Sequence, residues 1–357
     1  MAGLSGFNLQ SVSIARIDSS WVYPGEADYS GLLVEEDLTD STLSRFEEVK
    51  TWVDQARQTL SGDEPVLETG KQCLSPYECG FYAYCTKDKP KAEYPIKWLP
   101  RLGAKAEALE KLGIIDLRDV PDHMLNATQK KVKNHTLAAS TFFDVEATSK
   151  ILNAQSFPAY FLDFETINFP VPIWAGTRPY QQIPFQYSLH TLGVNGELAH
   201  LEFLDVSGSD PSRKFAEQLI SDCGEFGPIY VYNAGFEGAR LRELAERFTD
   251  LSERLLAIDD RLFDLLPLAR KYFYHPSQHG SWSIKKVLPA LVPELSYSNL
   301  EGVQDGGMAM DAFIEAIHTD TIKERKLEIT KQLLAYCEQD TLAMVKIFDA
   351  FSAKNRL

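Results

Sequence analysis

The sequence of 357 residues lacks long apolar runs and lacks a targeting segment. No stretch of 18 or more apolar residues suggests a membrane span. The N-terminus has no basic region followed by an apolar core, which excludes a recognisable signal peptide. We therefore expect a cytoplasmic protein with no membrane partner. Because 44% of the residues are hydrophobic, the chain can bury a large core, and its length favours two or three domains.

Positive charge is also scarce. The chain has 36 Lys and Arg against 51 Asp and Glu, a net charge of −15. This balance argues against a protein that coats nucleic acid nonspecifically, because phosphate binding depends on local Lys and Arg density. Residues 91–150 are the exception, with ten basic and eight acidic side chains. Acidity elsewhere suits metal-binding carboxylates as well as ordinary solubility.

Cysteine is rare, with five in the whole chain, yet three lie within thirteen residues: Cys73, Cys79 and Cys85. In an intracellular protein such clustering indicates an iron–sulfur or zinc site more often than disulfides. The spacing is not the CxxC of a zinc ribbon, and a complete site needs a fourth ligand. Cys223 and Cys337 are distant in sequence and unattractive for that role. Buried structural thiols are the alternative reading.

The segment YFLDFETINF, residues 160–169, reads as a buried strand that carries two carboxylates, Asp163 and Glu165. Residues two apart on a strand point to the same side. Two like charges in an apolar strand need a cationic partner, since unpaired buried charge is costly. A divalent metal held by oxygen ligands is the simplest one. An edge strand whose acids face water is the alternative.

Alternating strands and helices follow this segment. Two strands, 185–192 and 198–203, are joined by an Asn195-Gly196 turn. The further expected elements are helix 211–220, strand 228–233, and helices 236–248, 263–274 and 321–351. Three strands followed by alternating helix and strand predict an α/β domain over 156–357, with a ribonuclease-H-like mixed sheet flanked by helices.

The N-terminal half is expected to hold two smaller parts. Residues 1–90 predict an α+β region with short strands, a helix over 39–60 and the cysteine cluster. Residues 91–155 predict a helical connector with a helix-hairpin-helix-like turn at Gly113 and a basic stripe at 129–133. Such turns can present backbone N–H groups to phosphates. A plain helical linker with a solvated charged face fits the same residues.

Ordered motifs in the C-terminal domain resemble the DEDD superfamily of 3′–5′ exonucleases, to which DnaQ and RNase D belong. FLDFET matches its first motif through Asp163 and Glu165. YNAGFEGARL matches its strand-to-helix motif, with Glu237 where aspartate is usual. Tyr336-CEQ-Asp340 matches the YxxxD motif of the tyrosine subtype, and positions four apart share a helix face.

The resemblance implies a two-metal site for phosphodiester hydrolysis, with Mg²⁺ or Mn²⁺ as cofactors. Asp163 would bridge both ions, and Glu165, Glu237 and Asp340 would complete the ligands. The same resemblance gives Tyr336 the task of orienting the attacking water. Asp264, in a Phe-Asp-Leu sequence like the start of a family helix, is the reserve ligand for the second motif.

Other residues are weaker candidates for contact with a nucleic-acid 3′ end. Residues 280–300 resemble the segment before the third motif, and Lys285 and Lys286 within it could touch phosphates. Trp174 and Arg178, in the loop after the first motif, could stack on and clamp the end of a strand. A surface lysine pair and a packed loop are the alternative readings.

The cysteine-containing segment resembles the C-terminal tail of RecB-family nuclease domains, in which four cysteines hold an iron–sulfur cluster. In that family the nuclease acids and the first cysteine lie upstream of the tail. This implies a shortened member, or a partner chain that supplies the rest. The combined order resembles an uncharacterised bacterial family of unknown function, in which a full RecB-type domain precedes this arrangement.

Two functions follow as expectations. The first is metal-dependent 3′–5′ exonuclease action on single-stranded DNA or RNA, and the sequence does not choose between the two. The alternative is a catalytically impaired module for nucleic-acid binding or assembly within a larger RecB-like system.

Overall fold

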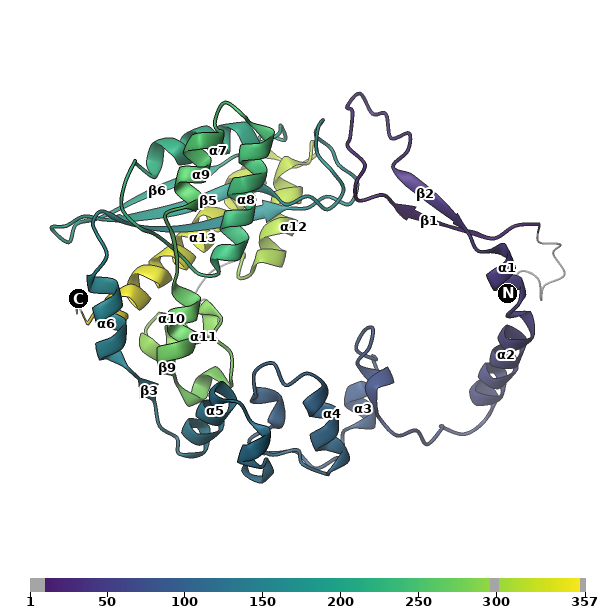
Figure 1. Ribbon diagram of the computed structural model, residues 1–357. Coiled ribbons are helices and arrows are strands. Elements are labelled where there is room, and N and C mark those ends of the chain that lie inside the picture. The colour runs from purple at the N-terminus through teal and green to yellow at the C-terminus, as the bar shows by residue number, and fades with distance from the viewer. Residues whose placement is uncertain (1–9, 296–301, 354–357) are drawn as a thin grey trace. The chain divides into compact units, whose positions relative to one another are not determined.

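The computed structural model describes residues 10–295 and 302–353 (Figure 1). The first nine residues, where we expected no signal peptide, lie outside the described residues. Residues 296–300 of the 280–300 segment also lie outside them. Across the described ranges no helix is both long and apolar enough to cross a membrane.

The chain divides into two units, and each is described by itself. The first comprises Met1–Lys91 with Pro170–Tyr180, and the second comprises Ala92–Phe169 with Gln181–Leu357. The loop that follows the FLDFET motif therefore belongs to the first unit, whereas the motif itself belongs to the second.

The first unit contains a hairpin and helices. Its strands pair antiparallel, with Ile17 opposite Leu33. Its elements are β1 (Ser13–Ile17), β2 (Leu33–Asp37), α1 (Thr39–Leu43), α2 (Phe46–Ser61) and α3 (Tyr82–Cys85). The single helix expected over 39–60 is thus two helices. Between them the Ser44 hydroxyl donates to the Ser41 carbonyl at 3.0 Å, a local bond that competes with regular helix.

A mixed five-stranded sheet forms the centre of the second unit, in the order β6-β5-β4-β7-β8. Its strands are β4 (Ala159–Ile167), β5 (Ile183–Leu192), β6 (Leu198–Leu204), β7 (Ile229–Val231) and β8 (Leu262–Asp264). β4, β5 and β6 form an antiparallel meander, and β7 and β8 run parallel to β4. The predicted meander and the α/β class, with a mixed sheet between helices, are confirmed. A further two-stranded pairing joins β3 (Phe142–Phe143) and β9 (Phe273–Tyr274).

Helices cover both faces of this sheet (Figure 1). Even positions of β4, such as Leu162 and Phe164, pack in one core with α7 (Ser212–Asp222), α8 (Ala234–Arg247) and α9 (Ser252–Asp259). The odd position Phe161 packs on the opposite side, where α13 (Lys323–Phe351) supplies Phe348. Because strand side chains alternate, the odd-numbered acids Asp163 and Glu165 also lie on the α13 side.

The helical connector was expected over residues 91–155. From residue 92 onward it belongs to the second unit and packs into the core on the α13 side through Leu109, Leu117 and Val132. Their helices are α4 (Ala104–Lys111), α5 (Ala127–Leu137) and α6 (Val145–Asn153). Gly113 makes the turn after α4 with φ +73°, but the next long helix begins only at Ala127, where Asn126 forms a capping box.

The basic stripe at 129–133 is largely occupied by contacts within the protein. Lys131 donates to the Arg270 carbonyl at 2.7 Å, and Lys133 donates to the Val120 carbonyl at 2.6 Å. Burial lowers the pKa of Lys131 to about 8. Two of the three lysines of the stripe therefore stabilise the connector against its neighbours.

The expected helix over 263–274 was wrong at both ends. Phe263 and Asp264 end strand β8, α10 spans Leu265–Tyr272, and the last two residues form β9. The Asp264 carboxylate accepts from the Leu266 backbone N–H at 2.9 Å, and this N-cap begins the helix after the strand. The remaining helices are α11 (Ile284–Leu291) and α12 (Gly306–Ile317).

Candidate functional site

Strand β4 places two carboxylates at the centre of the sheet. β4 pairs with β5 on one side and β7 on the other, and Asp163 lies opposite Ser188. Asp163 is half-buried, and Glu165 is 8% exposed. The edge-strand alternative, in which these acids face water, is therefore wrong.

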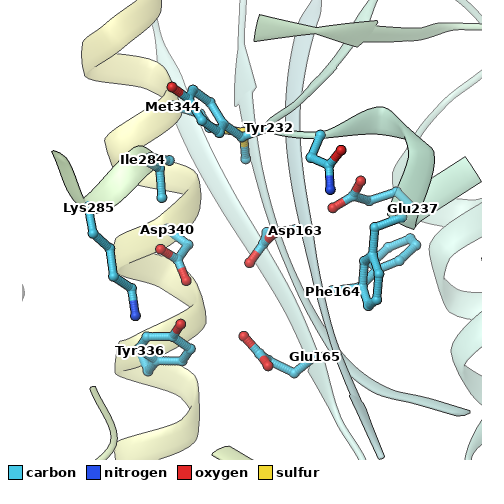
Figure 2. A pocket seen from close by; sticks show the side chains of 12 residues that line it. Asp163, Phe164, Glu165, Tyr232, Glu237, Ile284, Lys285, Tyr336, Asp340 and Met344 are labelled. Carbon is cyan, nitrogen blue, oxygen red and sulfur yellow. The ribbon is translucent and has the colours of Figure 1, made fainter. Parts of the chain in front are cut away.

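Helix α13 brings a third carboxylate to this pair. One oxygen each from Asp163, Glu165 and Asp340 lies within 4.8 Å of the others. Figure 2 shows the three side chains pointing toward one another between β4 and α13. Tyr336, one helical turn before Asp340, is buried beside them, as expected for positions four apart.

Helix α8 adds Glu237 from the other side of the space (Figure 2). Asn233, between β7 and α8, has a φ of +102°, a backbone conformation that costs energy for a residue other than glycine. This turn starts the helix so that Glu237 falls in its first turn. The Glu237 side chain is 3% exposed, and its Oε2 has no hydrogen-bond partner within the described residues.

The reserve ligand Asp264 has a different role. Its carboxylate accepts from the backbone N–H groups of Asn233 at 3.0 Å and Ala234 at 3.1 Å, in addition to the bond that caps α10. It is not among the residues that line the cavity. Asp264 therefore fixes the turn that carries Glu237, and Glu237 is the carboxylate that faces the cavity.

The carboxylates surround a cavity of about 240 Å³. Its wall combines the acids and Tyr336 with aromatic and aliphatic side chains that the sequence did not single out: Phe164, Tyr232, Phe236, Ile284 and Met344. Asn233, in the turn between β7 and α8, also lines it. The sequence offered one signal for Tyr232 and Phe236, since both lie within the YNAGFEGARL motif.

Burial and repulsion between carboxylates raise the pKa of three acids of this cavity. Burial, and next the Asp340 carboxylate, raises the pKa of Asp163 well above its ordinary value. The same two causes raise the pKa of Glu165 to about 8. Burial raises the pKa of Glu237 to about 7. Carboxylates that repel in this way gain from a cation between them.

The donor set fits divalent metal ions such as Mg²⁺ and Mn²⁺. These ions prefer carboxylate oxygens, and Asp163, Glu165 and Asp340 supply them within 4.8 Å of one another. The Oε2 atom of Glu237 is a buried acceptor for which a cation is a suitable partner.

Lys285 is the predicted nucleic-acid contact that the structure brings to the site. It lines the cavity, its Nζ lies 5.1 Å from the Tyr336 ring centroid, and it donates to the Gln304 carbonyl at 2.6 Å. Its charge opposes the rise in the pKa of Glu165. Lys286, next in the chain, is exposed and does not line the cavity.

Trp174 and Arg178 belong to the first unit, whereas the cavity belongs to the second. Trp174 is buried, and its carbonyl accepts from the Thr177 hydroxyl at 2.6 Å. Arg178 is exposed. Their contact with a strand end stays a prediction.

The three clustered cysteines also belong to the first unit. Cys73 is half-buried, and Cys79 and Cys85 are exposed, so the alternative of buried structural thiols does not hold. Over the described ranges they are not among the groups of ligand atoms that lie within 4.8 Å of one another. The iron–sulfur or zinc site stays a prediction, which the visible absorption spectrum of anaerobically purified protein tests.

The raised pKa values predict how stability varies with pH when no metal is present. A Glu titrates near 4.5 when unfolded and near 8 at Glu165 in the folded chain, so the folded state holds the extra proton in that interval. Stability should therefore fall as pH rises from about 4.5 to 8, by up to about 1.4 kcal/mol per pH unit for one such carboxyl. Urea unfolding in a chelator at pH 5.5 and pH 8 measures this.

Two comparisons complete this pH prediction. Glu165→Gln should flatten the fall in stability, and saturating Mg²⁺ should oppose it, because the ion replaces the proton. Glu246→Gln, at an exposed position of α8, should keep the wild-type profile. A stability that rises over this interval in the chelator would contradict the described burial.

Comparison with known proteins gives limited matches. Residues 160–283 match the sequence model of a domain of unknown function (DUF2779). That range includes Asp163, Glu165 and Glu237, whereas Tyr336 and Asp340 lie beyond it.

Two curated proteins are similar to this chain. Uncharacterized protein MG366 of Mycoplasma genitalium is 27% identical over 207 residues, which cover 52% of this chain and 31% of the relative. Uncharacterized protein UU173 of Ureaplasma parvum is 23% identical over 247 residues, which cover 59% of this chain and 35% of the relative. The chain thus spans about a third of the length of these relatives. No solved structure matches it significantly.

Proposed function

We propose that the second unit is a metal-dependent 3′–5′ exonuclease that hydrolyses phosphodiester bonds of single-stranded DNA or RNA. One observation carries the proposal: carboxylates from β4, α8 and α13 converge with Tyr336 on one cavity. Three separate elements supply them, so the convergence is not a by-product of one acidic segment. The arrangement suits chemistry that needs two cations held close together.

The fold supports the same assignment. A meander of three antiparallel strands precedes two parallel strands, each of which follows a helix. This is the ground plan that the sequence predicted for a ribonuclease-H-like domain. We propose that fold for the second unit, with the acids on the central strand β4.

The roles of the residues follow from their positions. Asp163 lies close to Asp340, Glu165 and Glu237, since each of these raises its pKa. It would hold the ions together with these three carboxylates. When bound, the ions supply Lewis-acid activation of the attacking water and charge stabilisation of the leaving oxygen. Burial, and next the Asp340 carboxylate, raises the pKa of Tyr336, so its hydroxyl stays protonated and can hold a water by hydrogen bonding.

The direct test is incubation of end-labelled single strands of DNA and of RNA with the protein and Mg²⁺ or Mn²⁺. We expect shortening from the 3′ end with release of nucleoside monophosphates, and a chelator should stop it. Absence of shortening, together with binding that is metal-independent and weakens with salt, would instead favour the nucleic-acid-binding or assembly module.

The lysine pair gives a matched prediction. Lys285→Ala should raise KM for the strand by about tenfold, because an ammonium that lines the cavity is removed. Lys286→Ala, which removes an exposed ammonium from the adjacent position, is the control and should change KM less than twofold. Equal effects of both variants in steady-state kinetics at fixed ionic strength would assign the pair to a general surface charge.

A further inference from the structure

A second group of ligand-type side chains lies outside the carboxylate cavity. His190 on β5 and His200 on β6 are direct partners across the hairpin, and their ring centroids are 4.5 Å apart. Glu338 on α13 completes the group. One ligand atom from each of the three lies within 4.8 Å of the others.

The surrounding hydroxyl groups determine the direction of the hydrogen bonds. Thr341 Oγ1 donates to the Glu338 backbone carbonyl at 3.0 Å, because a carbonyl can only accept. When all of these bonds form together, Thr341 Oγ1 has no second proton to donate, so it accepts from His190 Nδ1 at 2.8 Å and from Ser188 Oγ at 2.7 Å. The proton of Ser188 Oγ is then used in its bond to Thr341, so Ser188 Oγ accepts from His200 Nε2 at 2.9 Å.

This hydrogen-bond network fixes the tautomer of both imidazole rings. Each ring uses its N–H in the hydroxyl network, which leaves Nε2 of His190 and Nδ1 of His200 as lone-pair acceptors when the rings are neutral. His200 Nδ1 lies 3.8 Å from a carboxylate oxygen of Glu338. Two acceptors therefore face each other across a distance that is too long for a hydrogen bond, and a cation between them would satisfy both.

We propose that His190, His200 and Glu338 bind a divalent transition metal of the Zn²⁺ class. Two imidazoles and one carboxylate are a ligand set that this class prefers, whereas Mg²⁺ prefers oxygen alone. Hydrogen bonds from the outer ring nitrogens to protein groups are usual for histidines that bind metal, since they fix the tautomer and the ring orientation. This inference does not rest on the proposed nuclease function.

The geometry needs only a small closure. Ligand atoms of tetrahedral Zn²⁺ lie about 3.3 Å apart for bonds of about 2.0–2.1 Å. His190 is 4% exposed and held by its hydroxyl partner, whereas the Glu338 side chain is about half exposed, so Glu338 can move to close the site. Burial, and next His200, lowers the pKa of His190 to about 4, which keeps that ring neutral at neutral pH.

The metal would connect β5 and β6 to α13, the helix that carries Tyr336 and Asp340. Because α13 is held here two residues before Asp340, the ion would restrain the position of that carboxylate. The expected role is structural, so the primary readouts are metal binding and thermal unfolding.

The test is titration of the full chain with Zn²⁺ in excess Mg²⁺, followed by histidine-ring NMR and by calorimetry. The His190 and His200 ring signals, assigned from variants, should shift in a saturable way, and Mg²⁺ alone should leave them unchanged. His200→Gln and Glu338→Gln should each weaken the same binding event by about 100-fold or more, because each removes a direct ligand and the loss of an outer hydrogen-bond partner alone costs about 10–100-fold. Zn²⁺ should also raise the Tm of the wild type more than that of either variant.

Controls separate this site from other zinc-binding groups. Glu324→Gln removes an exposed carboxylate from the first turn of the same helix and should leave both readouts unchanged. Zinc held by the clustered cysteines would persist in all three variants and leave the ring signals unshifted. If His200→Gln does not fold, Glu338→Gln, at an exposed side chain, decides. Ring signals that do not respond to Zn²⁺, or binding unchanged in Glu338→Gln, would overturn the proposal.

Discussion

Asp163→Asn is expected to reduce metal-dependent trimming of a labelled strand on the order of 1,000-fold or more. The variant removes an acid that lies close to the three other carboxylates of the cavity, so the proposed ions would lose a ligand and part of the charge that balances them. The side chains are almost the same size, so packing around β4 is kept. The readout is the single-turnover rate with saturating Mn²⁺.

The same variant should become more stable in the absence of metal. Asp163 is held at a raised pKa by burial and by the neighbouring Asp340, so replacing its carboxylate by a neutral amide relieves a repulsion. We expect a higher Tm in chelator than for the wild type and a smaller gain on adding Mn²⁺. Glu246→Gln is the matched control and should keep both the rate and the Tm. Full trimming activity in Asp163→Asn would contradict the assignment.

Variants of Glu237 and Asp264 are expected to have different effects, because Glu237 is the proposed metal ligand and Asp264 holds the turn that carries it. Glu237→Gln should lower the trimming rate about 100-fold with little loss of stability, because it removes a buried carboxylate that faces the cavity. Asp264→Ala should cost about 1–2 kcal/mol of stability, the usual size for a lost N-cap, since its oxygens accept three backbone N–H groups.

Measuring both properties for both variants distinguishes these roles. Urea unfolding gives the stability, and the rate per folded molecule gives the chemistry. Glu237→Asp, which keeps the carboxylate and shortens the side chain by one methylene, should retain a substantial part of the wild-type rate. If Asp264→Ala lowers the trimming rate without lowering the stability, and Glu237→Gln keeps the wild-type rate, then Asp264 is the metal ligand.

Asp163 and Glu165 were predictable from the strand period, whereas Glu237, Tyr336 and Asp340 were expected from the resemblance of their motifs. Asp163 and Glu165 are two apart on a strand, and Tyr336 and Asp340 are four apart on a helix, so the backbone alone aligns each pair. The hairpin of β5 and β6 was also predictable, since Asn195-Gly196 marks the turn between its strands. Its register was not, because a two-residue turn at these positions would place residue 190 opposite residue 201, whereas the observed loop places His190 opposite His200.

Other features depend on partners distant in the sequence. Asp264 accepts from backbone N–H groups 30 and 31 residues away. The helical period of residues 263–274 contains no information about these contacts, so this role could not be predicted from it. The residues around Lys131 in the sequence predict a solvated stripe, yet Lys131 donates to the backbone carbonyls of residues 270 and 271. Likewise, Glu338 meets the histidines only because α13 packs across β5.

The central claim is that Asp163, Glu165, Asp340 and Glu237 together hold two divalent ions. The most direct measurement is anomalous scattering from crystals of the full chain soaked in Mn²⁺. The account predicts two peaks about 3.5–4 Å apart in the cavity, with Asp163 contacting both and Glu237 contacting one. No peak in the cavity, or a peak held by Asp264 with Glu237 turned away, would contradict it.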